Sequence, residues 1–267
     1  MVKAIVTGVA GRMGGRIVHM MEAADGVQLV GAVESPGHAA VGKDVGEVVG
    51  LPHKGVTVVD SLAQVLPKGE VVIEFTHPEP SLANLRAVAD AGKAMVLGTT
   101  GFAPPQIAEI QALASRAHLV FAPNMSVGVN LMFKVVADIA RVLGESYDVE
   151  IVEAHHRLKK DAPSGTAIKL GQVIAHALDR ELDKVGVYSR HGIIGQRTDK
   201  EIGIQTVRAG DIVGEHTVLF GGMGERLEII HRAHSRDNFA RGAVRAAQWI
   251  VTQPPGLYDM QDVLGLK

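Results

Sequence analysis

A glycine-rich turn near the N-terminus places the strongest constraint on what this chain can fold into. An apolar run at residues 4–7 predicts a strand, and glycines at positions 8, 11 and 14 lead from it into an amphipathic helix over about residues 12–23. Such a turn presents backbone N–H groups and a positive helix end, which together suit a pyrophosphate. A second predicted strand ends at Glu34, twenty residues after Gly14, where a carboxylate can take ribose hydroxyls.

Strand, glycines, helix, strand and acid in this order predict a dinucleotide-binding unit. The glycines are spaced GxxGxxG rather than the more familiar GxGxxG. The alternative interpretation is that they only permit tight helix packing and that Glu34 is a solvated strand end.

The first half of the chain alternates short apolar runs with helix-length amphipathic segments. Strands are predicted at residues 4–7, 28–33, 56–59, 71–75, 94–97 and 119–122, and helices at about 12–23, 82–91 and 105–117. Strands separated by helices are typical of right-handed crossovers. We therefore expect an α/β fold with a Rossmann-like, doubly wound parallel sheet.

The pattern changes after residue 126. A long helix at 127–143, a strand at 148–153 and a helix at 165–178 precede a strand-like region at 193–231, and a last helix covers 238–251. This order predicts a second, α+β domain with a mostly antiparallel open sheet. We expect residues 1–126, joined by 237–267, to form the dinucleotide-binding domain and residues 127–236 to form the second domain.

Composition limits the possible partners. The 27 basic residues nearly balance the 29 acidic ones, which disfavours binding to nucleic acid or to an anionic membrane surface. No apolar run reaches the roughly 18 residues of a membrane span. The chain has no cysteine, so disulfides and thiolate chemistry are excluded and a reducing compartment is favoured. We expect a cytoplasmic protein that binds a small molecule.

Two further turns follow predicted strands, at residues 98–102, beginning with Gly98-Thr99-Thr100, and at residues 122–126. Ligands of open α/β sheets lie at the carboxyl ends of the strands, so both turns are candidates to line a cofactor site, with ordinary loop chemistry as the alternative. The acid at position 34 would repel a 2′-phosphate, and neither Ser35 nor Pro36 supplies a cation, which leaves Arg12 as the alternative cation. We predict that NADH is used at least as well as NADPH.

Residues 153–166 combine potential proton donors, several cations and a helix start. The segment follows a predicted strand and contains Pro163, so it is predicted to be a strand end and loop. His155 and Lys159 can each deliver a proton while neutralising a dianion, and His156 adds to the local positive charge. A histidine pair could instead bind metal, but no third ligand stands at a familiar spacing, and we predict no metal site.

Ser164 is expected to cap a helix whose first-turn N–H groups, at Gly165 and Thr166, can bind a carboxylate. It lacks the turn context of a serine nucleophile. Arg157 and Lys160 are interpreted as solvated charges. The segment as a whole favours a small carboxylate ligand.

These residues resemble a known family. Residues 153–159 (EAHHRLK) and 161–166 (DAPSGT) are similar to the signature of bacterial dihydrodipicolinate reductase, now called 4-hydroxy-tetrahydrodipicolinate reductase. Supporting stretches extend across the chain, at residues 8–14 (GVAGRMG), 98–102 (GTTGF), 124–130 (NMSVGVN) and 208–216 (RAGDIVGEH).

The resemblance implies NAD(P)H-dependent reduction of 4-hydroxy-tetrahydrodipicolinate to tetrahydrodipicolinate in the diaminopimelate route to lysine. It implies hydride transfer to ring carbon 4 of a cyclic dicarboxylate, followed by protonation. It further implies a homotetramer assembled through the sheet of the second domain, which would bind substrate and form the oligomer.

Residue roles carry over by motif position. His155 corresponds to a proton donor or acceptor and Lys159 to a proton donor, while His156, Gly165 and Thr166 would bind the substrate carboxylates. Arg236 corresponds to a substrate-side arginine. The implied cofactor contacts are Gly8, Val9, Ala10, Gly11, Arg12, Met13, Glu34, Gly98, Thr99, Thr100, Ala122, Pro123, Asn124 and Met125.

Two departures stand out from the family pattern. Ser35 follows the acid at position 34 where many relatives have arginine, and Glu74 stands where aspartate is common. The competing hypotheses are a related amino-acid-pathway dehydrogenase, which the 155–166 segment disfavours, and a redox-sensing Rossmann protein without turnover, which the absence of a basic excess disfavours. Which of His155 and Lys159 transfers the proton, and whether water loss from the precursor is also catalysed, stay open.

Overall fold

The computed structural model describes all 267 residues and divides them into two compact units. Unit 1 consists of Met1–Val127 and Arg236–Lys267, and unit 2 consists of Gly128–Ser235. The last segment of the chain therefore returns to the unit that the first segment begins. None of the helices combines the length and apolarity that crossing a membrane requires.

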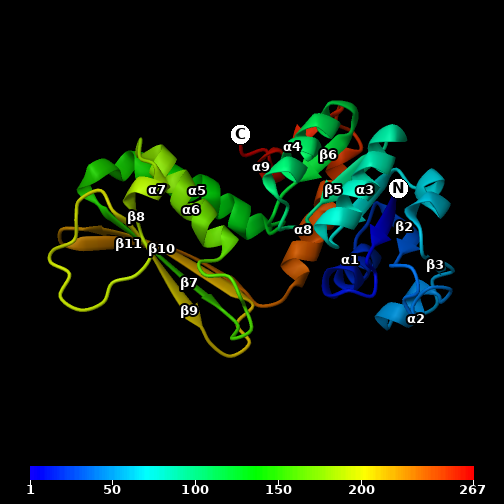
Figure 1. Cartoon of the computed structure of the whole chain (residues 1–267), viewed down its shortest axis with the longest axis horizontal. Helices are drawn as coiled ribbons and strands as arrows, with labels where there is room; N and C mark the ends of the chain where they lie inside the picture. Colours follow the sequence, from blue (N-terminus) through cyan, green and yellow to red (C-terminus); the bar gives the residue numbers. More distant parts are fainter. The chain divides into compact units, whose positions relative to one another are not determined.

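Unit 1 is built on a seven-stranded sheet in the order β12-β6-β5-β4-β1-β2-β3, and every neighbouring pair is parallel (Figure 1). The order reverses direction at β1, which is the arrangement of a doubly wound sheet. Its strands are β1 (Val2–Thr7), β2 (Val27–Val33), β3 (Val58–Val59), β4 (Val71–Glu74), β5 (Ala94–Leu97), β6 (His118–Phe121) and β12 (Gly256–Tyr258). The predicted Rossmann-like parallel sheet is confirmed.

The helices of unit 1 pack on this sheet because each buries one apolar stripe. In α1, for example, Ile17, Val18 and Met21 are buried in the core of the unit. The final long helix, α8, contributes a row of buried small residues to the same core, which allows its backbone to approach closely. The helices are α1 (Arg12–Glu22), α2 (Val45–Val49), α3 (Pro78–Asp90), α4 (Pro104–Leu113), α8 (Asp237–Ile250) and α9 (Met260–Leu264).

Unit 2 holds a five-stranded sheet in the order β11-β10-β7-β9-β8. The pairs β10–β11 and β10–β7 are antiparallel and contain most of the paired residues of the sheet. Strand β9 pairs with β7, and β8 pairs with β9, in parallel. This confirms the mostly antiparallel second sheet. Its elements are α5 (Val127–Leu143), β7 (Asp148–His155), α6 (Gly165–Ala177), α7 (Leu182–Val185), β8 (Gly186–Val187), β9 (Ile202–Arg208), β10 (Gly214–Gly222) and β11 (Glu225–Ala233).

Helices α5 and α6 cover only one face of the sheet in unit 2 (Figure 1). Side chains alternate across a strand, so Ile151 and Val218 point into the helix-covered core, while the neighbouring Val152 and Ile230 lie on the opposite, open face, where 39% and 43% of each residue is exposed. An open sheet face with exposed branched side chains is a candidate interface.

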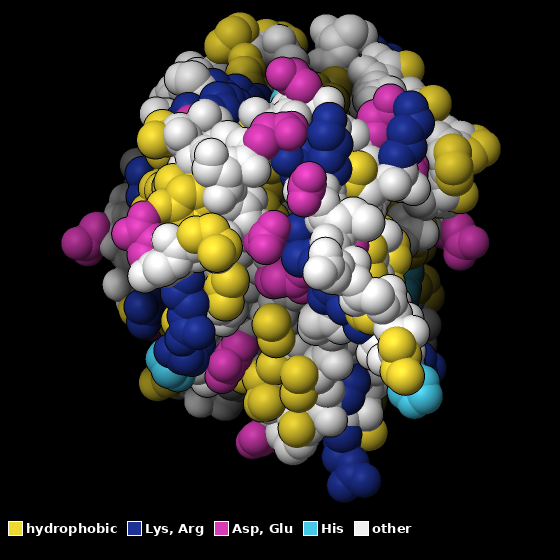
Figure 2. Space-filling view, turned by 90° about the vertical axis from the view of Figure 1, so that its left-hand side faces the viewer, with side chains coloured by type: hydrophobic (Ala, Val, Ile, Leu, Met, Phe, Trp, Pro, Cys, Tyr) yellow, Lys and Arg dark blue, Asp and Glu magenta, His cyan; other side chains and the backbone are white.

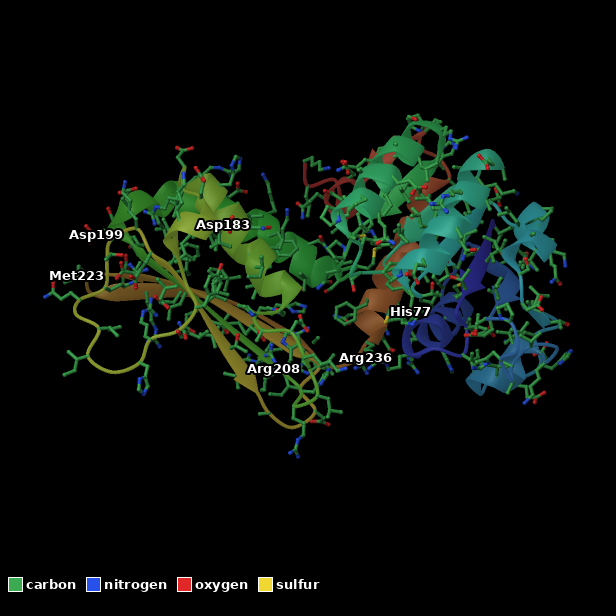
Figure 3. All side chains as sticks on the ribbon, viewed as in Figure 1. His77, Asp183, Asp199, Arg208, Met223 and Arg236 are labelled. Atoms are coloured by element: carbon green, nitrogen blue, oxygen red, sulfur yellow. The ribbon has the colours of Figure 1, made fainter.

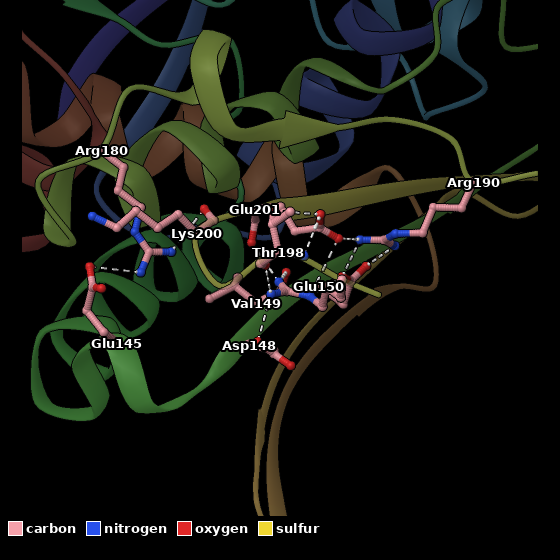
Figure 4. A network of polar contacts seen from close by, with 10 residues as sticks. Glu145, Asp148, Val149, Glu150, Arg180, Arg190, Thr198, Lys200 and Glu201 are labelled. Carbon is pink, nitrogen blue, oxygen red and sulfur yellow. Dashed lines mark hydrogen bonds and ion pairs between the residues drawn. The ribbon is translucent and has the colours of Figure 1, made fainter. Parts of the chain in front are cut away.

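A long loop between β8 and β9 corrects one expectation. The strand-like region was predicted from residue 193, but β9 begins only at Ile202. Gly192 and Gly195 have positive φ angles, which ends any extended run there. Arg190 binds both carboxylate oxygens of Glu150 at 2.9 and 2.7 Å and so ties the loop to β7 (Figure 4). On the face of the molecule in Figure 2, acidic and basic side chains lie next to one another.

Candidate active site

The glycine turn of unit 1 links β1 to α1 as the sequence predicted. Gly8 has a φ of +62°, and a Cβ at Gly14 would overlap the carbonyl of Gly8, so both positions require glycine. Gly11 is the N-cap of α1 and provides no side-chain cap, which leaves first-turn N–H groups without a side-chain partner. An uncapped helix start of this kind fits a phosphate group.

A cavity of about 610 Å³ adjoins this turn within unit 1. Five of the predicted cofactor contacts line it, namely Gly8, Gly11, Arg12, Met13 and Glu34. The remaining lining residues are Thr7, Val33, Ser35, Pro36, Asp60, Ser61, Leu62, Phe75, Thr76, His77, Pro80 and Asn84. Asp60 and Ser61 follow β3, a strand of only two residues, and the sequence analysis did not identify them.

Glu34 lies across the mouth of the glycine turn. Its carboxylate accepts hydrogen bonds from the backbone N–H of Ala10 at 3.1 Å and of Ser35 at 2.8 Å. Asp60 lines the same cavity, so two carboxyl groups stand on its wall, and Arg12 is the one arginine or lysine in the lining. The 2′-phosphate of NADPH, if it were placed beside Glu34 and Asp60, would therefore meet negative charge.

The predicted turn after β5 is held by buried contacts with the segment that follows β4. Thr99 is buried and its hydroxyl accepts from the N–H of Thr76 at 3.0 Å and contacts Ser81 at 2.7 Å. Glu74, fully buried, accepts from Ser81 at 3.1 Å and from Asn84 at 2.7 Å. This cluster joins the turn after β4 to the turn after β5, and it gives Glu74 a structural explanation that the sequence analysis lacked.

Glycines allow neighbouring segments to approach the turns after β5 and β6 closely. A Cβ at Gly98 would overlap the ring of Phe75, and a Cβ at Gly242 in α8 would overlap the carbonyl of Met125. Ala122 and Met125 are buried, Pro123 is exposed, and the side chain of Asn124 accepts from the N–H of Ser126 at 2.9 Å. Neither turn lines the cavity beside the glycines.

In unit 2, the end of β7 meets the start of α6. Glu153 on β7 is fully buried, and its carboxylate lies 2.6 Å from Nδ1 of His155 and accepts from the N–H of Ser164 at 2.9 Å. Ser164 caps α6 by accepting from the N–H of Ala167 at 3.2 Å, as predicted. The candidate proton-transfer residue and the candidate carboxylate-binding helix start thus share one buried carboxylate.

Two residues complete this cluster; both lie in the stretch 208–216 quoted above, but no role was predicted for either. Arg208 ends β9 (Figure 3) and binds both oxygens of Glu153, each at 2.8 Å. His216 on β10 places Nε2 3.1 Å from the Ser164 hydroxyl, and its ring meets that of His155 edge to face with centroids 5.3 Å apart. Burial lowers the pKa of His216 to about 3, so this ring is neutral near pH 7.

The remaining predicted residues differ in environment. Lys159 pairs with Asp161 at 2.9 Å and is mostly buried, whereas Arg157 and Lys160 are exposed. The buried Nδ1 of His156 has no hydrogen-bond partner within the chain. Gly165 has open space where a side chain would begin.

Arg236 belongs to unit 1, where it is the N-cap of α8 (Figure 3). The other predicted substrate residues, His156, Gly165 and Thr166, belong to unit 2.

Two models of one protein family match this chain. The family model described as "Dihydrodipicolinate reductase, N-terminus" matches residues 2–125, and "Dihydrodipicolinate reductase, C-terminus" matches residues 128–264. The chain belongs to the dihydrodipicolinate reductase family. Membership confirms the sequence resemblance and makes the chain an NAD(P)-dependent oxidoreductase of lysine biosynthesis through diaminopimelate.

Individual members of the reductase family agree over the full length. The 4-hydroxy-tetrahydrodipicolinate reductases of Syntrophobacter fumaroxidans and Syntrophus aciditrophicus are 60% and 57% identical over 267 residues, with 100% of both chains covered in each case. Among solved structures, a dipicolinate-bound dihydrodipicolinate reductase from Paenisporosarcina sp. TG-14 is 27% identical, with a TM-score of 0.75 and 98% of both chains covered.

Proposed function

We propose that this chain reduces 4-hydroxy-tetrahydrodipicolinate to tetrahydrodipicolinate with NADH or NADPH, and that the cluster at the end of β7 is where the substrate reacts. The observation that carries this proposal is that one buried carboxylate, that of Glu153, contacts both His155 and Ser164, the residue that caps the start of α6. A group that can move a proton then stands beside the first turn of a helix, whose N–H groups suit a carboxylate. The related reductase described as dipicolinate-bound binds a small cyclic dicarboxylate of the expected kind.

The residues of unit 2 divide the work by their chemistry. The N–H groups of Gly165 and Thr166, together with His156, would hold the substrate carboxylates. By motif position, Arg236 of unit 1 stays a proposed substrate-side arginine. His155 and Lys159 would hold and move the proton that completes the reduction. Positive charge close to the ring also stabilises the negative charge that develops there during reaction.

The residues of unit 1 fit a dinucleotide. The uncapped start of α1 would bind the pyrophosphate, and Glu34 would bind the ribose hydroxyls. Further cofactor contacts are proposed for the turns at 98–100 and 122–125. Bound reduced nicotinamide supplies the hydride.

Cofactor choice follows from charge in the cavity. Glu34 and Asp60 both line it, and Ser35 supplies no cation. A 2′-phosphate placed there would be repelled, so NADH is expected to serve at least as well as NADPH. A strong NADPH preference would contradict this reasoning.

The open sheet face of unit 2 supports a homotetramer. Val152, Val207 and Ile230 are about two-fifths exposed on it, which is unusual for a surface that stays in water. A monomer in sedimentation velocity would contradict this assembly. A cytoplasmic location stays a prediction.

The decisive experiment follows the absorbance of NADH, and separately of NADPH, with cyclic substrate generated in place from pyruvate and aspartate semialdehyde by its synthase. Substrate-dependent oxidation is expected, and the two values of kcat/KM rank the cofactors. Omitting the synthase is the control for substrate-independent oxidation. Binding of NADH without oxidation would instead favour a related dehydrogenase or a redox sensor.

A further inference from the structure

The carboxylate of Glu153 is fully buried, yet it is the point at which two functional elements meet. One oxygen lies 2.6 Å from Nδ1 of His155, and the other accepts from the N–H of Ser164, the N-cap of α6, at 2.9 Å. A buried charge is retained only when its partners compensate for lost hydration. Glu153 therefore needs an explanation beyond a surface ion pair.

Arg208 provides that compensation. Its two terminal nitrogens bind the two oxygens of Glu153, each at 2.8 Å, and Thr206 adds a hydroxyl at 3.3 Å. Burial alone would raise the pKa of Glu153, but the hydrogen bonds from Arg208, His155 and Ser164 outweigh it and lower this pKa to about 2. At neutral pH the carboxylate is ionised and can only accept hydrogen bonds.

This protonation state decides the tautomer of the neutral His155 ring. Because Glu153 can only accept, the hydrogen between the two groups must reside on Nδ1 of His155. The free lone pair then lies on Nε2, the nitrogen that approaches Gly214, where a side-chain Cβ would come within 3.1 Å of it. A glycine at this position keeps Nε2 clear of side-chain atoms.

We propose that Glu153 and Arg208 are positioning residues of the reaction, which fix the tautomer and the ring orientation of His155 and hold it in one arrangement with the first turn of α6. This inference rests on the proposed function, because it assumes that His155 faces the substrate. Neither Glu153 nor Arg208 needs to touch the substrate in order to act. They keep the proton-transfer atom and the carboxylate-binding N–H groups in a fixed relation.

Four charged or titratable groups face His155. Glu153 lies on β7, the strand of His155, whereas Arg208 lies on β9 and His216 on β10. Lys159 lies on the loop that follows β7. Burial lowers the pKa of His155, Glu153 opposes this lowering, and Lys159 and Arg208 add to it. Removing the charge of Glu153 should therefore move the apparent pKa of His155 further down.

The test is Glu153→Gln. The amide oxygen can still accept from the N–H of Ser164, but the NH₂ group then faces Nδ1 of His155 and favours the opposite tautomer. We expect kcat to fall by about 10²–10⁴-fold, with KM changed far less. The limb of the pH–rate profile that reports His155 should move to lower pH. The affinity for NADH should stay unchanged, since the glycine turn belongs to unit 1.

A matched control lies on the same strand. Glu150 is likewise a carboxylate paired with arginine, although it is only partly buried, and it belongs to the separate network of Figure 4. Glu150→Gln removes a comparable ion pair from a network that does not include His155. It should therefore leave kcat and the pH–rate profile unchanged. An equal loss of kcat in both variants would reduce Glu153 to a structural residue and overturn the inference.

A double-mutant cycle separates positioning from other effects. If Glu153 acts through His155, the double variant Glu153→Gln/His155→Asn should be no slower than His155→Asn alone, within about threefold. Fully additive losses would overturn the inference. An unaltered chain that does not oxidise NADH with substrate would refute the proposed function instead, whereas an active chain whose Glu153→Gln variant is equally active would refute only the positioning role.

Nitrogen NMR of histidine-labelled, unaltered protein gives an answer even if Glu153→Gln does not fold. The resonance that disappears in His155→Asn should show a protonated Nδ1 and an unprotonated Nε2 near neutral pH. The opposite tautomer would overturn the inference.

Discussion

Replacing His216 by glutamine should remove a large part of the acid sensitivity of unit 2. Only 3% of this residue is exposed, its Nε2 contacts the Ser164 hydroxyl, and its buried Nδ1 has no hydrogen-bond partner. Burial is the main cause that lowers its pKa, and the nearby His155 adds to it. Glutamine keeps a polar group for Ser164 but cannot take up a proton in this pH range.

The magnitude follows from linkage between protonation and folding. The pKa of His216 falls from 6.5 to about 3 on folding, which corresponds to about 5 kcal/mol. Because the folded pKa is the lower one, the unfolded chain takes up the proton first as the pH decreases. The free energy of unfolding should therefore be unaffected by this group above pH 6.5 and should fall by about 1.4 kcal/mol per pH unit between 6.5 and 3.

The assay is denaturant unfolding at several pH values between about 7.5 and 4.5, above the range in which Glu153 also titrates. Far-ultraviolet circular dichroism follows both units, while fluorescence of the single tryptophan, Trp249, follows unit 1. His155 and His231 have pKa values lowered by burial, so the variant should keep a smaller slope. His191→Gln, at an exposed histidine, is the control. A slope equal to that of the unaltered chain would refute the reasoning.

Two more predictions test the candidate sites. Gly98→Ala places a Cβ in the ring of Phe75 and should destabilise unit 1 by about 1–3 kcal/mol and weaken NADH binding, as measured by thermal unfolding and titration; unchanged values of both would show that Phe75 moves aside freely. Lys159→Ala should lower kcat by about 10²–10⁴-fold while NADH still binds, because the change lies in unit 2; undiminished turnover in a steady-state assay would remove Lys159 from the mechanism.

Local patterns in the sequence predicted most of unit 1. The apolar strands, the glycine spacing and the acid at position 34 depend on residues close together in the chain, and the parallel sheet follows from their alternation. Helix α3 begins at Pro78 rather than near residue 82, since proline is tolerated in the first turn of a helix. Among the shortest elements, β3 was predicted as a longer strand at 56–59, whereas β12 was not predicted, because three residues carry no detectable period.

Unit 2 was harder to predict beyond its class. The region from residue 193 has strand-forming residues, yet it forms a loop until Ile202 because side chains far apart in sequence hold it. Arg190 and Arg197 both bind Glu150, about forty residues earlier on β7. No window along the chain contains both partners of such a contact.

The predicted site was incomplete for the same reason. The signature segment contains His155, Lys159 and the cap of α6, and a local motif is enough to find them. Arg208 and His216 reach the site only because β9 and β10 both pair with β7, which sets Glu153 opposite Thr206 on one side and His216 on the other.

One signal in the sequence did point toward these partners. Along β7, side chains alternate between the core and the open face, so Glu153 falls on the same side as Ile151, in the core. A carboxylate at a core position cannot remain ionised without a cation, so a partner such as Arg208 had to come from a neighbouring strand. Identifying that partner requires the strand order and register, which only the fold supplies.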